Sequence, residues 1–207
     1  MARQSARRTL ENALRRIGFA RVAGVDEVGR GCLAGPVTAA AVVLGTGCRI
    51  TGLRDSKQLT AAARERLYDQ ITATATWAVA SCTPEEIDRI NIHRASLQAM
   101  RRAVMALGPL PDLVLVDAFR IPGLPMAQRP VVHGDRLCAA IAAASIVAKV
   151  TRDREMAVWH VQDPRYGFDR HKGYATAAHL AAVARFGCSP LHRRTFRPAS
   201  LFDTMDS

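Results

Sequence analysis

Two adjacent acids, Asp26 and Glu27, directly follow a short apolar run from Val22 to Val25. The apolar run indicates a buried strand, and carboxylates at the end of such a strand are costly unless a cation neutralises them. A hard divalent metal ion is the simplest such cation, because it prefers oxygen ligands. Neighbouring strand residues point to opposite faces, so we expect the backbone to bend where the two acids converge.

A glycine-rich basic turn, Gly29-Arg30-Gly31, comes directly after these acids. Glycine carries no Cβ, so the backbone of the turn can approach a ligand closely. Metal-binding acids beside a bare, basic turn are typical of phosphate chemistry. The simpler interpretation is a strand, a hairpin turn and a surface ion pair.

Two further acids stand at the ends of predicted elements. Asp117 follows a predicted buried strand, and Asp135 begins a predicted long helix. Parallel strands with helical crossovers bring such tips to one edge of a sheet. Asp153 is a rival fourth acid, although its place between two arginines favours an ion pair on a helix surface.

These acids form an oxygen-only set of candidate ligands, with no histidine–cysteine cluster in competition. Such a set suits magnesium or manganese better than zinc. Two ions could sit on a phosphodiester, one to activate a water and one to stabilise the leaving oxygen. The products would be a 3′-hydroxyl and a 5′-phosphate. The candidate metal ligands and catalytic residues are Asp26, Glu27, Asp117 and Asp135.

The composition favours a polyanionic partner. The net charge is +11 at pH 7 and the sequence pI is about 10.5, which favours nucleic acid first and an anionic membrane second. The alternative is a generally solvated, arginine-rich surface. Only three lysines occur, Lys57, Lys149 and Lys172, and each lies in a segment with other candidate residues. Lysine is a compact point charge, so we expect all three to contact substrate.

Ser56 and Lys57 lie just before a helix predicted over residues 62–72, with Thr60 as its N-cap. A helix N-terminus with short polar side chains holds phosphate well, so both are candidate substrate contacts. The alternative is a capped helix beside an exposed lysine. Tyr174 ends a loop rich in aromatic and basic residues, a composition that suits stacking on a sugar or a base.

Cysteine usage and hydropathy indicate a cytoplasmic protein. The five cysteines form no C-x-x-C pair, so neither a zinc site nor a disulfide framework is indicated. No apolar run approaches the ~18 residues of a membrane span. We therefore expect a cytoplasmic monomer with no membrane partner.

Hydrophobic periodicity and breaker residues predict the order of elements. A short amphipathic helix lies within residues 1–20, for which a transit peptide is the alternative. Residues 118–130 are predicted to be a loop. The predicted strands cover 22–25, 35–44, 74–82, 111–116 and 131–132. One short predicted helix begins at Pro84. The other predicted helices cover 62–72, 93–107, 135–161 and 176–186.

Several stretches, taken together and in order, resemble the type 2 ribonucleases H (bacterial ribonuclease HII) over residues 20–197. The resemblance implies an α/β fold, a ribonuclease H-like mixed five-stranded sheet flanked by helices with a small helical C-terminal extension. It also implies a basic arm over 1–20, a catalytic domain over 21–162 and a substrate-contacting extension and tail over 163–207. The matching stretches are 26–31, 55–57, 116–117, 134–135, 143–153, 171–174 and 192–196.

The resemblance implies an endonuclease that cuts RNA in RNA–DNA hybrids and ribonucleotides embedded in DNA, as in ribonucleotide excision repair. It implies that the four acids bind the metal, with Asp135 direct or through water. The turn from Gly29 to Gly31 would read the ribose 2′-hydroxyl, and Tyr174 would pack on the sugar. Ala118 departs from the glycine that is common after Asp117, and we expect little loss from it. The alternatives are a catalytically silent binding module and a DNA-acting nuclease.

Overall fold

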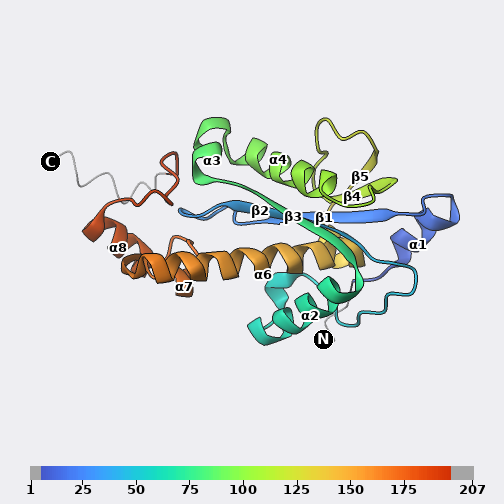
Figure 1. Ribbon diagram of the computed structural model, residues 1–207, viewed down its shortest axis with the longest axis horizontal. Coiled ribbons are helices and arrows are strands. Elements are labelled where there is room, and N and C mark those ends of the chain that lie inside the picture. Colours follow the sequence, from blue (N-terminus) through green and yellow to red (C-terminus); the bar gives the residue numbers. More distant parts are fainter. Residues whose placement is uncertain (1–5, 197–207) are drawn as a thin grey trace.

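The computed structural model describes residues 6–196, and its centre is a mixed five-stranded sheet (Figure 1). The strand order is β3-β2-β1-β4-β5. β1 pairs antiparallel with β2 and parallel with β4, while β2–β3 is antiparallel and β4–β5 is parallel. The predicted mixed sheet is confirmed. The strands are β1 (Val22–Val28), β2 (Val37–Val43), β3 (Thr76–Cys82), β4 (Leu113–Asp117) and β5 (Ala127–Val131).

Helices cover both faces of this sheet. α3 and α4 lie over one face, whereas the long α6 runs along the other with α2 beyond it (Figure 1). α7 and α8 lie at the C-terminal end of α6. The α-helices are α1 (Thr9–Arg16), α2 (Ala61–Thr74), α3 (Pro84–Ile90), α4 (Ile92–Met105), α5 (Gly134–Leu137), α6 (Ala139–Gln162), α7 (Phe168–His171) and α8 (Ala177–Phe186), with 3-10 turns η1 (Ser56–Gln58) and η2 (Pro164–Tyr166).

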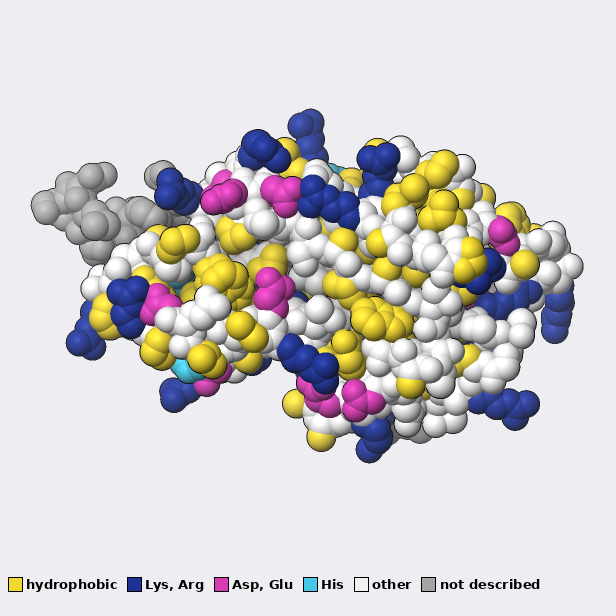
Figure 2. Space-filling view, in the orientation of Figure 1, with side chains coloured by type: hydrophobic (Ala, Val, Ile, Leu, Met, Phe, Trp, Pro, Cys, Tyr) yellow, Lys and Arg dark blue, Asp and Glu magenta, His cyan; other side chains and the backbone are white. Residues whose placement is uncertain are grey.

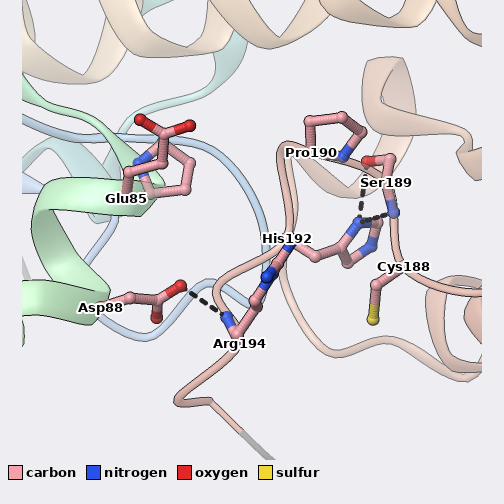
Figure 3. Close-up of a pocket in the computed structure, with 8 residues that line it drawn as sticks. Glu85, Asp88, Cys188, Ser189, Pro190, His192 and Arg194 are labelled. Atoms are coloured by element: carbon pink, nitrogen blue, oxygen red, sulfur yellow. Dashed lines mark hydrogen bonds between the residues drawn. The ribbon is translucent and has the colours of Figure 1, made fainter.

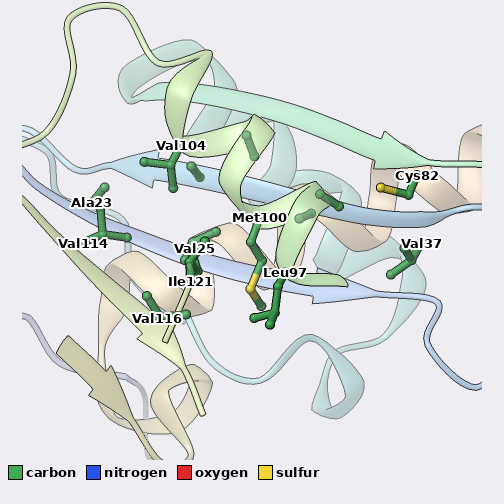
Figure 4. Packing of buried hydrophobic residues seen from close by; sticks show 14 of the residues in the cluster. Ala23, Val25, Val37, Cys82, Leu97, Met100, Val104, Val114, Val116 and Ile121 are labelled. Atoms are coloured by element: carbon green, nitrogen blue, oxygen red, sulfur yellow. The ribbon is translucent and has the colours of Figure 1, made fainter. Parts of the chain in front are cut away.

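Alternation along β1 explains how one strand serves two cores. Ala23 and Val25 belong to the buried cluster that also contains Met100 and Val104 of α4 (Figure 4). Gly24, between them, faces α6, where a Cβ would lie 2.2 Å from the backbone carbon of Ala140. The absence of a side chain therefore lets α6 pack directly on the central strand. The first half of α6 is rich in alanine, and these small side chains also allow the close approach of the helix to the strand.

Short polar side chains begin several helices, as the sequence predicts. The hydroxyl of Thr60 accepts a hydrogen bond from the Ala63 N–H at 3.2 Å, and that of Thr176 accepts one from the His179 N–H at 3.3 Å. Each bond satisfies an N–H that has no partner within its helix. The predicted starts of α2 and α8 are therefore confirmed.

The prediction of one helix over residues 135–161 is wrong. α5 ends at Leu137, Cys138 is extended (φ −115°, ψ 123°), and α6 begins at Ala139. The physical reason lies in α1, where the buried carboxylate of Glu11 accepts a hydrogen bond from the Ala140 N–H at 2.8 Å. In an uninterrupted helix, the Ala140 N–H would bond to a carbonyl of the preceding turn. Here a side chain from α1 satisfies this N–H and so caps the start of α6.

The predicted loop over residues 118–130 is also wrong in part, because it contains β5. This strand runs from Ala127 to Val131 and includes Pro130, which lies opposite Val116 of β4. Proline lacks an N–H, but an edge strand needs ladder bonds on one side only, so it tolerates proline.

The surface mixes charges of both signs. On the face in Figure 2, lysine and arginine side chains lie in separate groups with acids between them. Among residues 6–196, no helix is long and apolar enough to cross a membrane. The predictions that concern residues 1–5 and 197–207 fall outside the described residues.

Candidate active site

A cavity of about 340 Å³ lies beyond the carboxyl ends of β1 and β4. It brings together the four candidate acids, the glycine-rich turn and most of the candidate substrate contacts. The lining residues are Asp26, Glu27, Val28, Gly29, Arg30, Gly31, Ser56, Lys57, Asp117, Asp135, Ser145, Lys149 and Tyr174.

The acids converge because β1 and β4 stop pairing just before them. The register between these strands ends at Val25 opposite Val116. β1 stays paired with β2 through Val28, so the ladder on that side is unbroken at Asp26 and Glu27. We expected the backbone to bend at the two acids, and the strand continues through them without a break. Beyond Val25, β1 has no ladder partner on its β4 side, and the carboxylates reach the cavity there.

Three of the four carboxylates have a hydrogen-bond or ion-pair partner within the protein. One Asp26 oxygen accepts a hydrogen bond from the Glu27 N–H at 2.8 Å. A Glu27 oxygen lies 3.1 Å from the Arg30 guanidinium. Asp117 Oδ1 accepts a hydrogen bond from the Gly134 N–H at 2.8 Å. These bonds hold the acids in place without a cation.

The acids also destabilise one another's charged forms. Burial, with repulsion from Glu27 and Asp117, raises the pKa of Asp26 well above its ordinary range. Burial raises the pKa of Glu27 as well, although Arg30 opposes the effect. Burial and the neighbouring Asp55 raise the pKa of Asp135. Both desolvation and like charges favour the neutral acid, so a cation in this cavity would stabilise the ionised set.

The donor chemistry fits a hard divalent ion. All four acids offer oxygen atoms to one cavity, and such ligands suit magnesium or manganese. As the side chains lie, no group of three or more His, Cys, Asp or Glu within residues 6–196 is arranged to hold a metal ion. Glu27 is engaged with Arg30 in this arrangement. Rotation away from Arg30 would free Glu27 for a metal.

Two buried arginines hold the glycine-rich turn, and sequence reasoning missed both roles. Arg193 is 2% exposed and donates hydrogen bonds to the carbonyl oxygens of Gly29 (2.6 Å), Arg30 (2.9 Å) and Gly35 (3.0 Å). Arg152 is fully buried and donates to the carbonyls of three other residues. Those residues are Ala34, Pro36 and Lys172. Neither guanidinium is paired with a carboxylate in the hydrogen bonds described.

The space around the turn requires glycine at Gly29. Its φ is +91°, and a Cβ there would lie 2.4 Å from Nε of Arg152. The two constraints act together, because the guanidinium occupies the space that a side chain would need. The signal for Arg193 was present in the matching stretch 192–196, but a basic segment near the end of a basic chain looks like surface.

Tyr174 is fixed beside the turn by its backbone. It forms an isolated antiparallel bridge with Cys32, and the neighbouring Gly173 carbonyl accepts a hydrogen bond from the Leu33 N–H at 2.8 Å. Its ring is 39% exposed and lies with its centroid 5.7 Å from the Lys149 ammonium. The phenol therefore presents a face to the cavity rather than filling the core.

The candidate lysines lie in different places. Lys57 is exposed at the cavity, and its N–H donates to the Asp55 carboxylate at 2.9 Å. Lys149 lines the cavity and pairs with Asp153 at 2.7 Å, so Asp153 forms the helix-surface ion pair that the sequence favoured. Lys172 lies outside the cavity lining, and its ammonium donates to the Asp169 carbonyl at 2.6 Å.

A model of the ribonuclease HII family matches residues 23–199 of the chain. The chain belongs to the ribonuclease HII family. The family is one of endonucleases, so the chain is an enzyme of the hydrolase class, and the family predicted from the motifs is confirmed.

Individual relatives agree with the family model. Ribonuclease HII of Ralstonia nicotianae is 59% identical over 179 residues, which cover 84% of this chain and 76% of the relative. The crystal structure of ribonuclease H2 from Pyrococcus horikoshii matches with a TM-score of 0.73 at 28% identity, over 86% of this chain and 94% of that one. A ribonuclease HIII in complex with Mn²⁺ matches at 0.66 and 23% identity, over 91% of this chain and 70% of that one, and supports the fold.

Ribonuclease HII enzymes depend on divalent metal ions, in agreement with the acidic cavity. The sequence resemblance implies glycine at the position of Ala118, and the local backbone gives a physical reason for that expectation. Ala118 has a φ of +61°, in the left-handed region. That conformation costs a residue with a Cβ about 1 kcal/mol. The cost falls on the backbone next to Asp117 and not on the side chain that reaches the cavity.

Proposed function

We propose that the chain hydrolyses the RNA strand of RNA–DNA hybrids and cuts on the 5′ side of ribonucleotides embedded in duplex DNA. One observation carries the proposal: a single cavity holds four carboxylates, a bare glycine turn and an exposed tyrosine ring. The carboxylates suit metal-assisted phosphodiester hydrolysis. The turn and the ring suit recognition of a ribose.

Asp26, Glu27, Asp117 and Asp135 would hold Mn²⁺ or Mg²⁺, two ions in the substrate complex, with Asp135 bound directly or through water. Such ions activate a water and stabilise the leaving oxygen, which gives 3′-hydroxyl and 5′-phosphate ends. Glu27 would leave Arg30 to serve this site. The released guanidinium would then be free to approach a substrate phosphate.

Ribose selectivity would come from the turn of Gly29, Arg30 and Gly31. Only RNA carries the 2′-hydroxyl, so a protein needs a contact to that group to tell RNA from DNA. The Arg193 and Arg152 bonds to the carbonyls around this turn support a rigid backbone at the reading position. Tyr174 would pack on the sugar at the RNA–DNA junction.

Phosphate contacts would come from Ser56, Lys57 and Lys149 at the cavity. Lys172 stays a prediction, because it lies outside the cavity lining and would meet only a duplex that extends past it. The five cysteines are all free, which fits a reducing compartment such as the cytoplasm. We propose that the enzyme acts there as a monomer.

The test uses a labelled duplex with one embedded ribonucleotide and its all-DNA twin. Cutting 5′ of the ribonucleotide with Mn²⁺ or Mg²⁺, abolished by chelator, is the expected result, with the twin intact. Equal cutting of both duplexes would support a DNA-acting nuclease instead. Binding without cutting under all metal conditions would support a silent binding module.

Tyr174→Ala tests the junction role. Removal of the ring should lower cutting at an embedded ribonucleotide about tenfold more than cutting of a long hybrid, because stacking contributes roughly 1–3 kcal/mol. Tyr68→Ala is the control, because Tyr68 of α2 packs near Trp77 of β3 and does not line the cavity. Equal losses on both substrates would refute the junction role of Tyr174.

A further inference from the structure

Three histidines lie beneath Tyr174, and the proposed chemistry uses none of them. They belong to three segments: His171 to α7, His179 to α8, and His192 to the segment after α8. His179 is fully buried and His192 is 5% exposed. Their mutual arrangement is defined by backbone groups, which makes the position of each proton deducible.

The first proton position follows from Ser189. The Ser189 N–H and the Ser189 hydroxyl oxygen each lie 2.9 Å from Nδ1 of His192 (Figure 3). The N–H can only donate, so Nδ1 is an acceptor and carries no proton. A neutral imidazole has one proton, and in His192 it must lie on Nε2. Nε2 of His192 is 3.0 Å from Nε2 of His179, so His192 is the donor in that bond.

The second proton position follows from the first. Nε2 of His179 accepts from His192, so the single proton of neutral His179 lies on Nδ1. That nitrogen is 2.9 Å from the carbonyl oxygen of Tyr174, which can only accept. The hydrogen bonds therefore run in one direction, from the Ser189 N–H through His192 and His179 to the Tyr174 carbonyl.

The relay requires two neutral rings. A proton added to His192 Nδ1 would face the Ser189 N–H, and one added to His179 Nε2 would face the His192 N–H. Burial lowers the pKa of His192 to about 4 and also lowers the pKa of His179. Both rings are therefore neutral at neutral pH.

The groups that face this pair are few. The ring of His171 stacks on His179 with centroids 4.3 Å apart, and its Nδ1 accepts from the Gly173 N–H at 3.2 Å. The Tyr166 ring lies 4.9 Å from His192, and Asp163 raises the pKa of His192 without offsetting burial. His192 and Ser189 also line a cavity of about 440 Å³ beside α3, so the outer end of the relay borders open space (Figure 3).

We propose that His192 and His179 are positioning residues, which form a one-directional hydrogen-bond relay that fixes the Tyr174 backbone and holds its ring at the cavity. The functional part of this inference rests on the proposed junction role of Tyr174. The relay itself is a statement about proton positions, so it can be tested without substrate or metal.

The direct test is long-range ¹H–¹⁵N NMR of the imidazoles in the metal-free full chain at pH 7. The expected spectrum shows His192 protonated on Nε2 and His179 protonated on Nδ1, with assignments from His192→Gln and His179→Asn. His179 protonated on Nε2, or either ring charged at pH 7, would overturn the relay.

The functional test compares His179→Asn with His179→Leu. The asparagine amide N–H occupies about the place of Nδ1 and keeps a donor for the Tyr174 carbonyl, whereas leucine removes it. We expect leucine to lower the ratio of embedded-ribonucleotide cutting to long-hybrid cutting about fivefold, the size of one lost hydrogen bond. Asparagine should restore most of that ratio.

His160→Gln is the matched control, because His160 pairs with Asp169 on the surface of α6 and takes no part in the relay. Equal ratios in the leucine and asparagine variants would refute the positioning role. The Tyr174→Ala result separates the two proposals. If that variant leaves the ratio unchanged, the junction role fails, and the NMR spectrum alone decides on the relay.

Discussion

At the scale of single residues, the cavity makes the ionised form of its carboxyl groups unfavourable. Asp26 is 7% exposed and its pKa is raised by burial and by two neighbouring carboxylates. Ser145 and the Glu27 N–H oppose this effect without removing it. A divalent cation in this cavity would therefore relieve a cost that the metal-free protein bears.

Asp117→Asn should separate chemistry from folding. The amide oxygen can still accept the Gly134 N–H bond, but one negative charge at the metal site is lost. We expect turnover to fall by on the order of 10³-fold or more, while hybrid affinity stays within about twofold, because the phosphate contacts remain. Single-turnover cutting and fluorescence anisotropy measure the two quantities. Asp112→Asn, at the opposite end of β4, is the control, and an unchanged rate in Asp117→Asn would show that Asp117 is not a ligand.

Sequence reasoning located correctly the residues whose position depends on a local pattern. Asp26 and Asp117 each follow a continuous apolar run, which marks a buried strand tip directly. Arg152 and Arg193 carry no such mark, because their partners are backbone carbonyls from distant segments. In a chain with 29 basic residues, nothing local separates a buried guanidinium from an exposed one.

At the scale of elements, the joint between α1 and α6 was the least predictable. Glu11 lies 129 residues from Ala140, and its own helix suggests only a surface acid in the first turn. Caps such as Thr60 were predictable because donor and acceptor are three residues apart. The break at Cys138 depended on a partner that no local pattern reveals.

Glu11→Gln should change how stability depends on pH. Burial raises the pKa of Glu11 above its ordinary value of 4.5. The folded state then holds this proton more tightly than the unfolded state, so the wild type loses stability as pH rises above that value. Glutamine keeps an acceptor for the Ala140 N–H and does not titrate. Relative to wild type, its free energy of unfolding should rise by on the order of 1 kcal/mol between about pH 4 and pH 8. Urea denaturation across this range measures it, and parallel curves would contradict the expectation.

Arg193→Lys tests the support of the glycine-rich turn. An ammonium cannot reproduce the fork that binds Gly29, Arg30 and Gly35 together. We expect a loss of about 2 kcal/mol in the free energy of unfolding, with a fall in cutting at embedded ribonucleotides. Arg185→Lys on the exposed side of α8 is the control. Wild-type stability in the Arg193 variant would mean that the turn keeps its conformation without the hydrogen bonds from this guanidinium.

At the scale of the whole molecule, the large net positive charge does not exclude acids from the surface. The net charge of +11 coexists with acids among the basic side chains on the face in Figure 2. The mixed five-stranded sheet and its flanking helices followed from the family resemblance, which covers most of the chain, whereas the order of the strands did not. Pro130 obscured β5, because proline in a short run reads as loop until the edge position is known.

Lys57→Ala should reduce the salt dependence of hybrid binding. Each neutralised phosphate contributes close to one to the slope of log affinity against log salt, so we expect that slope to fall by about 0.9. Binding titrations at several salt concentrations with Asp117→Asn as background give the value. Arg101→Ala, exposed on α4 over the opposite sheet face, should leave the slope unchanged. An unchanged slope for Lys57→Ala would remove Lys57 from the phosphate contacts.

The length of α6 has a consequence for insertions and deletions. This helix carries Ser145, which lines the cavity with Asp26, and seven positions later Arg152, which donates a hydrogen bond to the carbonyl of Lys172. A helix advances about 1.5 Å and turns about 100° per residue. One residue added between Ser145 and Arg152 would therefore swing the guanidinium to another side of the rod. One continuous helix therefore keeps the acids at a fixed spacing from the backbone around Tyr174, and a single insertion cannot change that spacing without also rotating Arg152.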